Sequence, residues 1–216
     1  MIKRGVLFSV LAAVVFCTAY LSIRVVHARS VVVDKFNTIL TKDELAISAV
    51  SIEHQQWLLM IEDPGFYDHN GIDLQTPGAV ITTITQSLVK QLFFDKFKPG
   101  WRKLDQSLIA WLAVTPKISK TDHLAALFEI AYLGRCDGGQ VYGFEAAASC
   151  YYQGTLATLN DDQYLSLVTM LIGPNHFHPV NNPARHKDRL TRVTKVVKGE
   201  CQAQGNGDVL FKACAG

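Results

Sequence analysis

The chain has 216 residues, which suits one domain of ordinary size with an appendage rather than two full domains. Hydrophobic residues make up 49% of it and charged residues 19%, which excludes a disordered chain. The formal net charge is +2, but residues 1–29 hold four basic residues and no acidic one, which leaves 17 basic against 19 acidic residues in the remainder. A slightly acidic body lacks the concentrated basic surface that phosphate binding needs, so we expect no nucleic-acid partner.

The first thirty residues have the pattern of a membrane anchor. Lys3 and Arg4 precede nineteen residues without a charge, from Gly5 to Ile23, and a helix needs about 20 apolar residues to cross a hydrocarbon core of about 30 Å. The apolar part of a secretory signal peptide is shorter, so we predict an uncleaved anchor within residues 1–29. A cleaved signal and a buried core helix are the alternatives. The positive N-terminus favours a cytoplasmic start, which places residues 30–216 outside.

The first half of the outer part contains two helix-start signals. Residues 30–40 are an apolar lead-in whose secondary structure the pattern leaves open. Residues 41–44 fit a capping box and predict a helix through Trp57 to Ile61. A second capping box at Thr83 and Gln86 begins another helix, in which Lys90 falls off the apolar face.

Helical periodicity continues to the end of the chain. Further helices are predicted at residues 101–115, 121–133, 143–152, 160–173 and 183–197. In the first of these, the residues expected to lie away from the apolar stripe are Arg102, Lys103 and Gln106. In the last, we expect inward-facing Leu190, Val193 and Val197 and outward-facing Arg185, Arg189 and Arg192. Alternating strand patterns are nearly absent, so we predict an all-α domain over residues 30–200, followed by a tail at 201–216.

Four cysteines lie in the outer part, and their even number suits an oxidising compartment. Cys201 and Cys214 are spaced to close a loop, and Cys136 with Cys150 is the natural second pair. Four cysteines allow three connectivities, and free thiols are a further alternative. The sequence His176-Phe177-His178 has no third ligand nearby, so we interpret it as an ordinary loop rather than a metal site.

Polar and aromatic residues gather after the apolar helix that ends near residue 62. Glu62 and Asp63 are followed by Phe66 and His69. A carboxyl group in a cleft matters because burial raises its pKa toward neutrality, where it can transfer protons. Taken alone, this pattern is explained more simply by a capped helix end.

The order of several segments resembles glycosyltransferase family 51, the peptidoglycan glycosyltransferase domain of bifunctional penicillin-binding proteins and of monofunctional, membrane-anchored enzymes. The most specific segment is Glu62-Asp63-x-x-Phe66-x-x-His69-x-Gly71. It is followed in order by Thr83-x-Thr85-Gln86-x-Leu88-x-Lys90, Trp101-Arg102-Lys103, Ser119-Lys120, Tyr132-Leu133-Gly134 and Tyr142-Gly143-Phe144. The resemblance covers about residues 45–195, and the single anchor before one such domain looks like the monofunctional type.

This resemblance implies a lysozyme-like helical fold of two lobes with a cleft between them, entered from the bilayer surface. The implied reaction joins disaccharide-pentapeptide units of lipid II into a β-1,4 glycan and releases undecaprenyl pyrophosphate. Lipid II and the nascent glycan are the implied partners, together with cell-wall or secretion-complex proteins. The implied location is the bacterial inner membrane, with a single span and the domain on the periplasmic or outer side.

The resemblance also implies roles for individual residues. Glu62 matches the family's catalytic base. The residues that match substrate-binding or site-shaping positions are Asp63, Phe66, His69, Thr83, Gln86, Lys90, Arg102, Lys103 and Gln106. A divalent cation, Mg²⁺ or Mn²⁺, is a candidate cofactor that would assist the cationic side chains in holding the pyrophosphate.

The chain departs from the family pattern around the expected pyrophosphate site. The family's R-K-x-x-E reads Arg102-Lys103-Leu104-Asp105-Gln106, so an amide stands in place of the second glutamate. Asp105 is a candidate metal ligand in its place, although one residue along a helix is a rotation of about 100°. The segment between Asp73 and Thr82 is also shorter than the family's, in which it forms a mobile flap over the donor site.

Three functional hypotheses follow from the preserved base motif and the altered pyrophosphate site. The first is a divergent but working glycan polymerase. The second is a member that does not polymerise and instead binds lipid II or glycan within an envelope complex. The third is lytic cleavage of glycan by the single cleft glutamate, for which the sequence motifs of lytic transglycosylases are absent.

Overall fold

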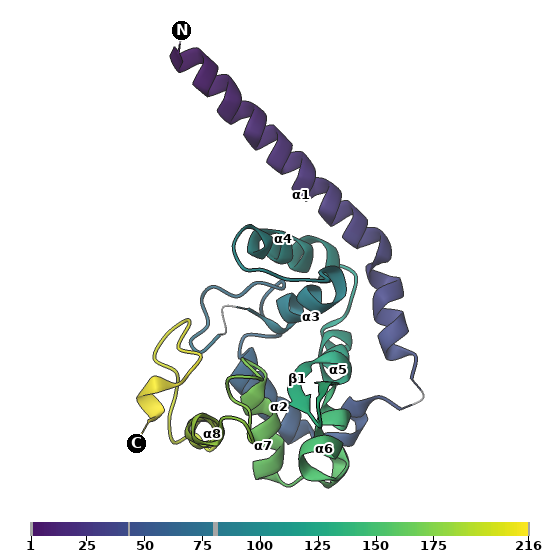
Figure 1. The fold of residues 1–216 in the computed structure, drawn as a ribbon, viewed down its shortest axis with the longest axis vertical. Coiled ribbons are helices and arrows are strands. Elements are labelled where there is room, and N and C mark those ends of the chain that lie inside the picture. The colour runs from purple at the N-terminus through teal and green to yellow at the C-terminus, as the bar shows by residue number, and fades with distance from the viewer. Residues whose placement is uncertain (1, 43, 80–81, 216) are drawn as a thin grey trace.

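The computed structural model describes residues 2–42, 44–79 and 82–215. One long helix, α1 (Ile2–Leu40), projects from a mainly helical body (Figure 1). This confirms the predicted mainly-α fold behind an apolar N-terminal helix.

The body consists of short helices and one hairpin. The described elements after α1 are the 3-10 turn η1 (Ala46–Ala49), α2 (Ile52–Glu62), α3 (Ile84–Phe93), α4 (Trp101–Ile109), the π-helical turn η2 (Ala110–Val114), α5 (Lys120–Ile130), β1 (Tyr132–Cys136), β2 (Gly139–Tyr142), α6 (Phe144–Tyr152), η3 (Leu156–Thr158), α7 (Asp161–Met170), α8 (Pro183–Val197) and η4 (Lys212–Cys214). α2 packs against α7 and α8, whereas α3 packs against α4, η2 and α5. Figure 1 shows α3 and α4 on the side of the body from which α1 projects, and α2, α7 and α8 on the other side.

The two parts of α1 have different surroundings. Its first part is long and apolar enough to cross a membrane and is exposed, with Phe8 and Phe16 70% and 74% exposed. Farther along, Ala28, Val32 and Phe36 recur at four-residue steps and are buried where α1 contacts α4, η2 and α5. Burial of a side chain such as Phe36 stabilises the docked helix by about 2 kcal/mol. The lead-in at residues 30–40 therefore continues the helix, and a wholly buried core helix is excluded.

The predicted start of the second helix was wrong. Its N-cap is Ser51, whose side chain accepts a hydrogen bond from the amide of His54 at 3.1 Å. Thr41 instead follows the end of α1, and Asp43 lies outside the described residues. Ser51 satisfies an otherwise free amide of the first turn as well as Thr41 would have done, which is why the sequence pattern alone did not separate the two sites. The second predicted capping box, at Thr83 and Gln86, is confirmed at the start of α3.

The orientation predicted for the helix at residues 101–115 was also wrong in part. Trp101, Leu104 and Trp111 are 51%, 45% and 49% exposed, whereas Asp105 and Gln106 are buried. The polar face of α4 packs inward because α1 and α3 offer hydrogen-bonding partners to it. The helix therefore carries exposed apolar side chains, and Figure 1 shows α4 on the side of the body from which α1 projects.

A hairpin interrupts the predicted succession of helices. α5 ends at Ile130, three residues before the predicted end, and Gly134 is part of β1. β1 and β2 pair antiparallel, with Tyr132 opposite Tyr142. Nine residues hold both strands, too short a stretch for an alternating pattern to be recognised. A disulfide between Cys136 and Cys150 ties the hairpin to α6.

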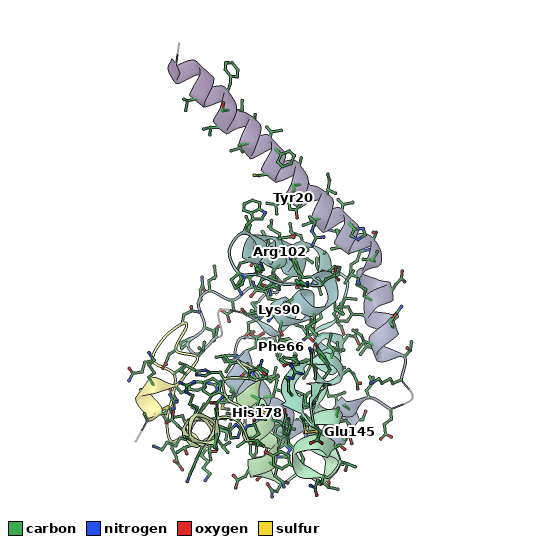
Figure 2. The ribbon with its side chains drawn as sticks, in the orientation of Figure 1. Tyr20, Phe66, Lys90, Arg102, Glu145 and His178 are labelled. Atoms are coloured by element: carbon green, nitrogen blue, oxygen red, sulfur yellow. A yellow bond between two sulfur atoms is a disulfide. The ribbon has the colours of Figure 1, made fainter. Side chains whose placement is uncertain are left out.

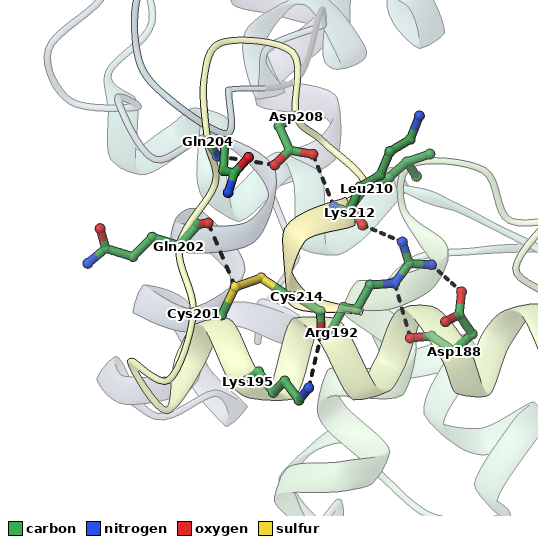
Figure 3. Close-up of a disulfide and its surroundings, with 10 residues drawn as sticks. All are labelled: Asp188, Arg192, Lys195, Cys201, Gln202, Gln204, Asp208, Leu210, Lys212 and Cys214. Carbon is green, nitrogen blue, oxygen red and sulfur yellow. Dashed lines mark hydrogen bonds and ion pairs between the residues drawn. A yellow bond between two sulfur atoms is a disulfide. The ribbon is translucent and has the colours of Figure 1, made fainter. Parts of the chain in front are cut away.

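The last long helix shows the most consequential difference from prediction. Pro183 occupies the first turn of α8 and Val193 is buried, as expected. Arg189 and Arg192, expected to face solvent, are 0% and 9% exposed. Both side chains donate hydrogen bonds to the C-terminal segment. A second disulfide, Cys201–Cys214, closes this segment into a loop, beside which Figure 3 shows Arg192. Buried charges on α8 are therefore neutralised or hydrogen-bonded within the body.

Candidate active site

A groove of about 360 Å³ opens where the ends of α2, α3 and α4 meet. Its polar lining comes from Glu62, Thr82, Ser87, Lys90, Lys103 and Gln106. Apolar walls come from Ile84, Phe97, Pro99, Leu127, Leu171 and Ile172. The groove therefore brings together four of the residues that the sequence singled out: Glu62, Lys90, Lys103 and Gln106.

Glu62 is the last residue of α2 and is 8% exposed. Burial raises the pKa of its carboxyl to about 7, and the charge of Asp63 adds to this, while Arg189 acts in the opposite direction. Its Oε1 accepts a hydrogen bond from Nη2 of Arg189 at 3.4 Å. A carboxyl with such a pKa exchanges its proton near neutrality, which is the property of a general acid or base.

Arg189 is a member of this site that the sequence interpretation missed. Its guanidinium also donates to the carbonyl oxygens of Thr169 at 3.2 Å and Val209 at 2.6 Å. A signal was available, because Arg189 stands one helical turn before the buried Val193 and so shares its inward face. The three hydrogen bonds, to Thr169, Val209 and Glu62, use three different nitrogens of one planar guanidinium. Together they fix its orientation beside Glu62.

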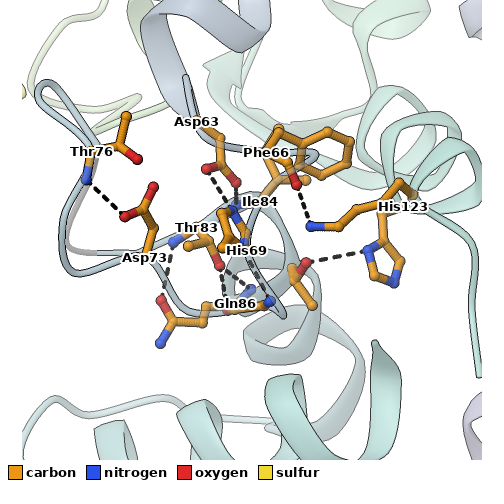
Figure 4. A network of polar contacts seen from close by, with 12 residues as sticks. Asp63, Phe66, His69, Asp73, Thr76, Thr83, Ile84, Gln86 and His123 are labelled. Atoms are coloured by element: carbon orange, nitrogen blue, oxygen red, sulfur yellow. Dashed lines mark hydrogen bonds and ion pairs between the residues drawn. The ribbon is translucent and has the colours of Figure 1, made fainter. Parts of the chain in front are cut away.

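Asp63 and His69 form a separate hydrogen-bonded network behind the groove (Figure 4). Asp63 is 1% exposed; its Oδ2 accepts from the amide of Ile84 at 2.9 Å, and its Oδ1 lies 2.8 Å from Nε2 of His69. The amide of Gly71 donates to Nδ1 of His69 at 3.0 Å. These contacts fasten the start of α3 to the end of α2, so Asp63 and His69 act on the groove by positioning its walls.

This network also tests whether a metal fits beside it. Ligand atoms of Asp63, His69 and Asp73 all lie within 4.8 Å of one another. Because Nδ1 of His69 accepts the proton of the Gly71 amide, Nε2 carries the imidazole proton and donates it to Asp63. Neither nitrogen then has a free lone pair, so the observed arrangement does not fit a metal ion.

Phe66 is buried in the turn after Glu62 and does not line the groove. It is 1% exposed, and Nζ of Lys120 lies 4.5 Å from the centre of its ring. Lys120 also donates a hydrogen bond to the Phe66 carbonyl oxygen. Partial burial lowers the pKa of Lys120, against the opposing charge of Asp63. The structure thus gives Phe66 a packing contact that orders the turn after Glu62.

Thr83, Gln86 and Gln106 connect α3 to α4. Thr83 caps α3 and donates its hydroxyl to the carbonyl oxygen of Gly71 at 2.7 Å. Gln86 donates its side-chain amide to Oγ of Ser107 at 2.7 Å, and Gln106 donates its own to the carbonyl oxygen of Gln86 at 2.6 Å. Among the described residues, Oε1 of Gln106 is buried without a partner. Gln106 therefore lines the groove as a neutral group held in one orientation.

Two ammonium groups give the groove a positive end. Lys90 comes from α3 and Lys103 from α4, where it donates to Oγ1 of Thr82. Partial burial, and secondarily the charge of Lys90, lowers the pKa of Lys103. Cations that repel one another in this way mark a site that an anion would stabilise.

Arg102 and Asp105 do not reach this groove. They line a separate hollow with Tyr20 and Arg24 of α1. Figure 2 labels Arg102 on the side of the body that faces Tyr20. Asp105 is 2% exposed and accepts from Nε of Arg24 at 3.0 Å, while Arg102 donates to the carbonyl oxygen of Lys96. One residue along α4 is a rotation of about 100°, which turns Arg102 away from Lys103 and Asp105 away from Gln106.

The groove itself does not fit a divalent cation. Within the described part of the chain, Glu62 is the only carboxylate that lines it. Hard cations prefer several oxygen ligands, usually carboxylates, and here an amide and two ammonium groups stand opposite Glu62. We derive no reaction step through a metal ion.

Comparisons of the sequence with known proteins point to one family. A sequence model of the family described as Transglycosylase matches residues 30–198. Penicillin-binding protein 1B of Vibrio cholerae is 30% identical over 153 residues, which are 65% of this chain and 20% of that protein. The same protein of Escherichia coli is 30% identical over 154 residues, with 65% and 18% covered. The biosynthetic peptidoglycan transglycosylase of Methylobacillus flagellatus is 30% identical over 158 residues, with 67% and 66% covered. The matched region thus spans about a fifth of the two penicillin-binding proteins.

Proposed function

Because the chain belongs to the transglycosylase family, we propose that it polymerises lipid II into peptidoglycan strands, with Glu62 as the general base. The hydroxyl oxygen of the acceptor sugar attacks the anomeric carbon of the donor, and the bond from that carbon to the pyrophosphate breaks. The hydroxyl proton passes to Glu62. The observation that carries this proposal is the buried carboxyl of Glu62, with a pKa raised to about 7, in one groove with two ammonium groups.

The cations have a complementary role in this proposal. A departing lipid pyrophosphate gains negative charge, and charged donors placed in advance stabilise it most where water is scarce. Lys90 and Lys103 line the groove that holds Glu62. In this proposal Lys90 and Lys103 bind the pyrophosphate, and Gln106 contributes a fixed, neutral wall. Arg102 takes no part, since it lines the separate hollow beside α1.

A lipid-linked substrate also suits the position of the domain. α1 is long and apolar enough to span a bilayer. The exposed Trp101 and Leu104 belong to α4, which lies on the side of the body from which α1 projects. Tryptophan is favoured at the boundary of membrane and water. We propose a single-pass protein of the bacterial inner membrane whose groove opens on the periplasmic or outer side, close to the lipid head groups.

One observation favours a second candidate function, the binding of lipid II or glycan without polymerisation. The family's second glutamate is replaced by Gln106, which is 0% exposed and held by its bond to Gln86. A neutral amide attracts a cation less strongly than a carboxylate does, and it is not a base at neutral pH. The groove can then still bind an anion through Lys90 and Lys103, but it lacks the second carboxylate for the reaction. The protein would then act as a component of an envelope complex.

A turnover assay separates the two functions. The purified full chain in detergent is incubated with labelled lipid II, and the products are separated as a glycan ladder. We expect ladders from the parent and none from Glu62→Gln, which preserves shape but cannot accept the proton. Glu53→Gln, at an exposed position of the same helix, is the matched control and retains activity.

Two results would contradict the proposal that the protein polymerises lipid II with Glu62 as the base. Ladders of equal intensity from the parent and from Glu62→Gln would remove Glu62 as the base. Retention of labelled lipid II by the parent without any ladder would favour the binding function instead.

A further inference from the structure

The segment after α8 lies beyond the residues that match the family, which end at 198. We call residues 201–214 the C-terminal tail; the Cys201–Cys214 disulfide closes it into a loop. In Figure 1 it lies beside α8 and the loops that precede α3. Two sets of contacts connect the tail to the groove of Glu62.

The first set holds Arg189 and Arg192 of α8, and Figure 3 shows the contacts of Arg192. The carbonyl oxygen of Val209 accepts from Nη1 of Arg189 at 2.6 Å, and the Phe211 ring centre lies 5.9 Å from the guanidinium carbon. The next carbonyl oxygen, that of Leu210, accepts from Nη1 of Arg192 at 2.7 Å. Phe211 is 1% exposed, so the tail is packed into the body at this point.

The second set holds the loop that leads to α3. The amide of Gly78 donates to the carbonyl oxygen of Gly205 at 2.9 Å, and the amide of Gly207 donates to that of Ala79 at 3.3 Å. Thr82, a few residues farther along the chain, lines the groove and accepts from Lys103. The tail is therefore hydrogen-bonded to residues 78 and 79 as well as to α8.

We propose that the C-terminal tail is a positioning element of the site: it seats Arg189 so that its guanidinium stays beside the carboxyl of Glu62. Arg189 reaches Glu62 through Nη2 at 3.4 Å, a contact too long to fix the guanidinium by itself. The shortest of its bonds is the one to Val209. Without the tail, the buried Nη1 of Arg189 would lose the Val209 carbonyl oxygen as its acceptor. The guanidinium would then change its orientation to form another hydrogen bond.

The electrostatic consequence follows from the groups around Glu62. Arg189 comes from α8, Asp63 adjoins Glu62 in the chain, Lys90 comes from α3 and Lys103 from α4. Arg189 is the cation that opposes the effect of burial on the pKa of Glu62. If Arg189 moves away, the carboxyl retains its proton to higher pH. This inference rests on the proposed function only where it concerns catalysis; the effect on the titration of Glu62 does not require turnover.

The test compares variants of the full chain in detergent. Phe211→Leu removes the ring beside Arg189, and Cys201→Ser with Cys214→Ser opens the tail. The matched control is Cys136→Ser with Cys150→Ser, which opens the other disulfide, between the hairpin and α6. The titration of Glu62 is followed by ¹³C NMR with labelled glutamate, and the resonance that disappears in Glu62→Gln identifies it. The pH profile of polymerisation is measured on the same samples.

We expect the midpoint of the Glu62 titration, and the acidic limb of the activity profile, to rise by about 1 pH unit in both tail variants and to stay in place in the control. Equal midpoints in the parent and in Phe211→Leu would overturn the inference, even if the double serine variant failed to fold. A shifted titration in a protein that makes no glycan would retain the inference and remove the proposed polymerase. If both tail variants make glycan with the same pH profile as the parent, the polymerase proposal stands and the inference about the tail is wrong.

Discussion

Replacing Glu62 by glutamine should make the stability of the protein less dependent on pH. The carboxyl titrates near 4.5 in an unfolded chain and at about 7 in the folded protein. Below pH 4.5 it is protonated in both states, and it then resembles the amide of glutamine. Between pH 4.5 and 7 the folded protein retains a proton that the unfolded chain has released, so its free energy of unfolding falls as the pH rises.

The size of this effect follows from the two pKa values. The difference corresponds to about 3 kcal/mol, reached once the pH exceeds the folded value. Glutamine does not ionise, so the free energy of unfolding of Glu62→Gln does not fall in this way as the pH rises. We therefore expect Glu62→Gln to gain about 3 kcal/mol of stability relative to the parent between pH 4 and pH 8.

The measurement is urea unfolding of the full chain in detergent, at several pH values, followed by tryptophan fluorescence with the disulfides intact. Glu53→Gln serves as the control, because its side chain is exposed on the same helix, and its stability should follow that of the parent at every pH. A stability difference between Glu62→Gln and the parent that stays constant from pH 4 to pH 8 would refute the reasoning. It would mean that the carboxyl titrates alike in both states.

Two further changes test the surroundings of the groove by urea unfolding. Gln106→Glu removes the amide donor to the Gln86 carbonyl oxygen and buries a charge, so we expect a loss of about 2 kcal/mol at pH 8; unchanged stability would contradict the assigned bond. Arg24→Ala leaves the carboxylate of Asp105, 2% exposed, without its cation, so we expect a loss of about 2 kcal/mol. Adding Asp105→Asn should recover most of that loss, and no recovery would show that Arg24 acts through packing alone.

Signals contained within a few residues were enough to predict much of this protein. The uncharged run from Gly5 to Ile23 predicted the apolar N-terminal helix, and the capping box at Thr83 predicted the start of α3. Pro183 correctly marked the first turn of α8. Such signals work because a cap or an apolar run acts on backbone groups of its own turn, whatever the rest of the chain does.

The motif that contains Glu62 indicated the site, but its surroundings depended on packing. Arg189 stands 127 residues from Glu62 in the chain, and its charge gave it the appearance of a solvent-facing residue. Arg102 and Asp105 belong to the same short motif as Lys103, yet they line the hollow beside α1 and not the groove of Glu62.

What the sequence by itself determined was therefore the apolar N-terminal helix, most of the helices of the body and the acid at the end of α2. Only the tertiary structure decided which face of each helix is buried. It also decided which charged residues, far apart in the chain, form ion pairs with each other. A helix of mixed polarity, such as α4 or α8, can bury its polar side only if other elements supply the partners. Those partners, including the C-terminal tail against Arg189, are brought within bonding distance only when the whole core is packed.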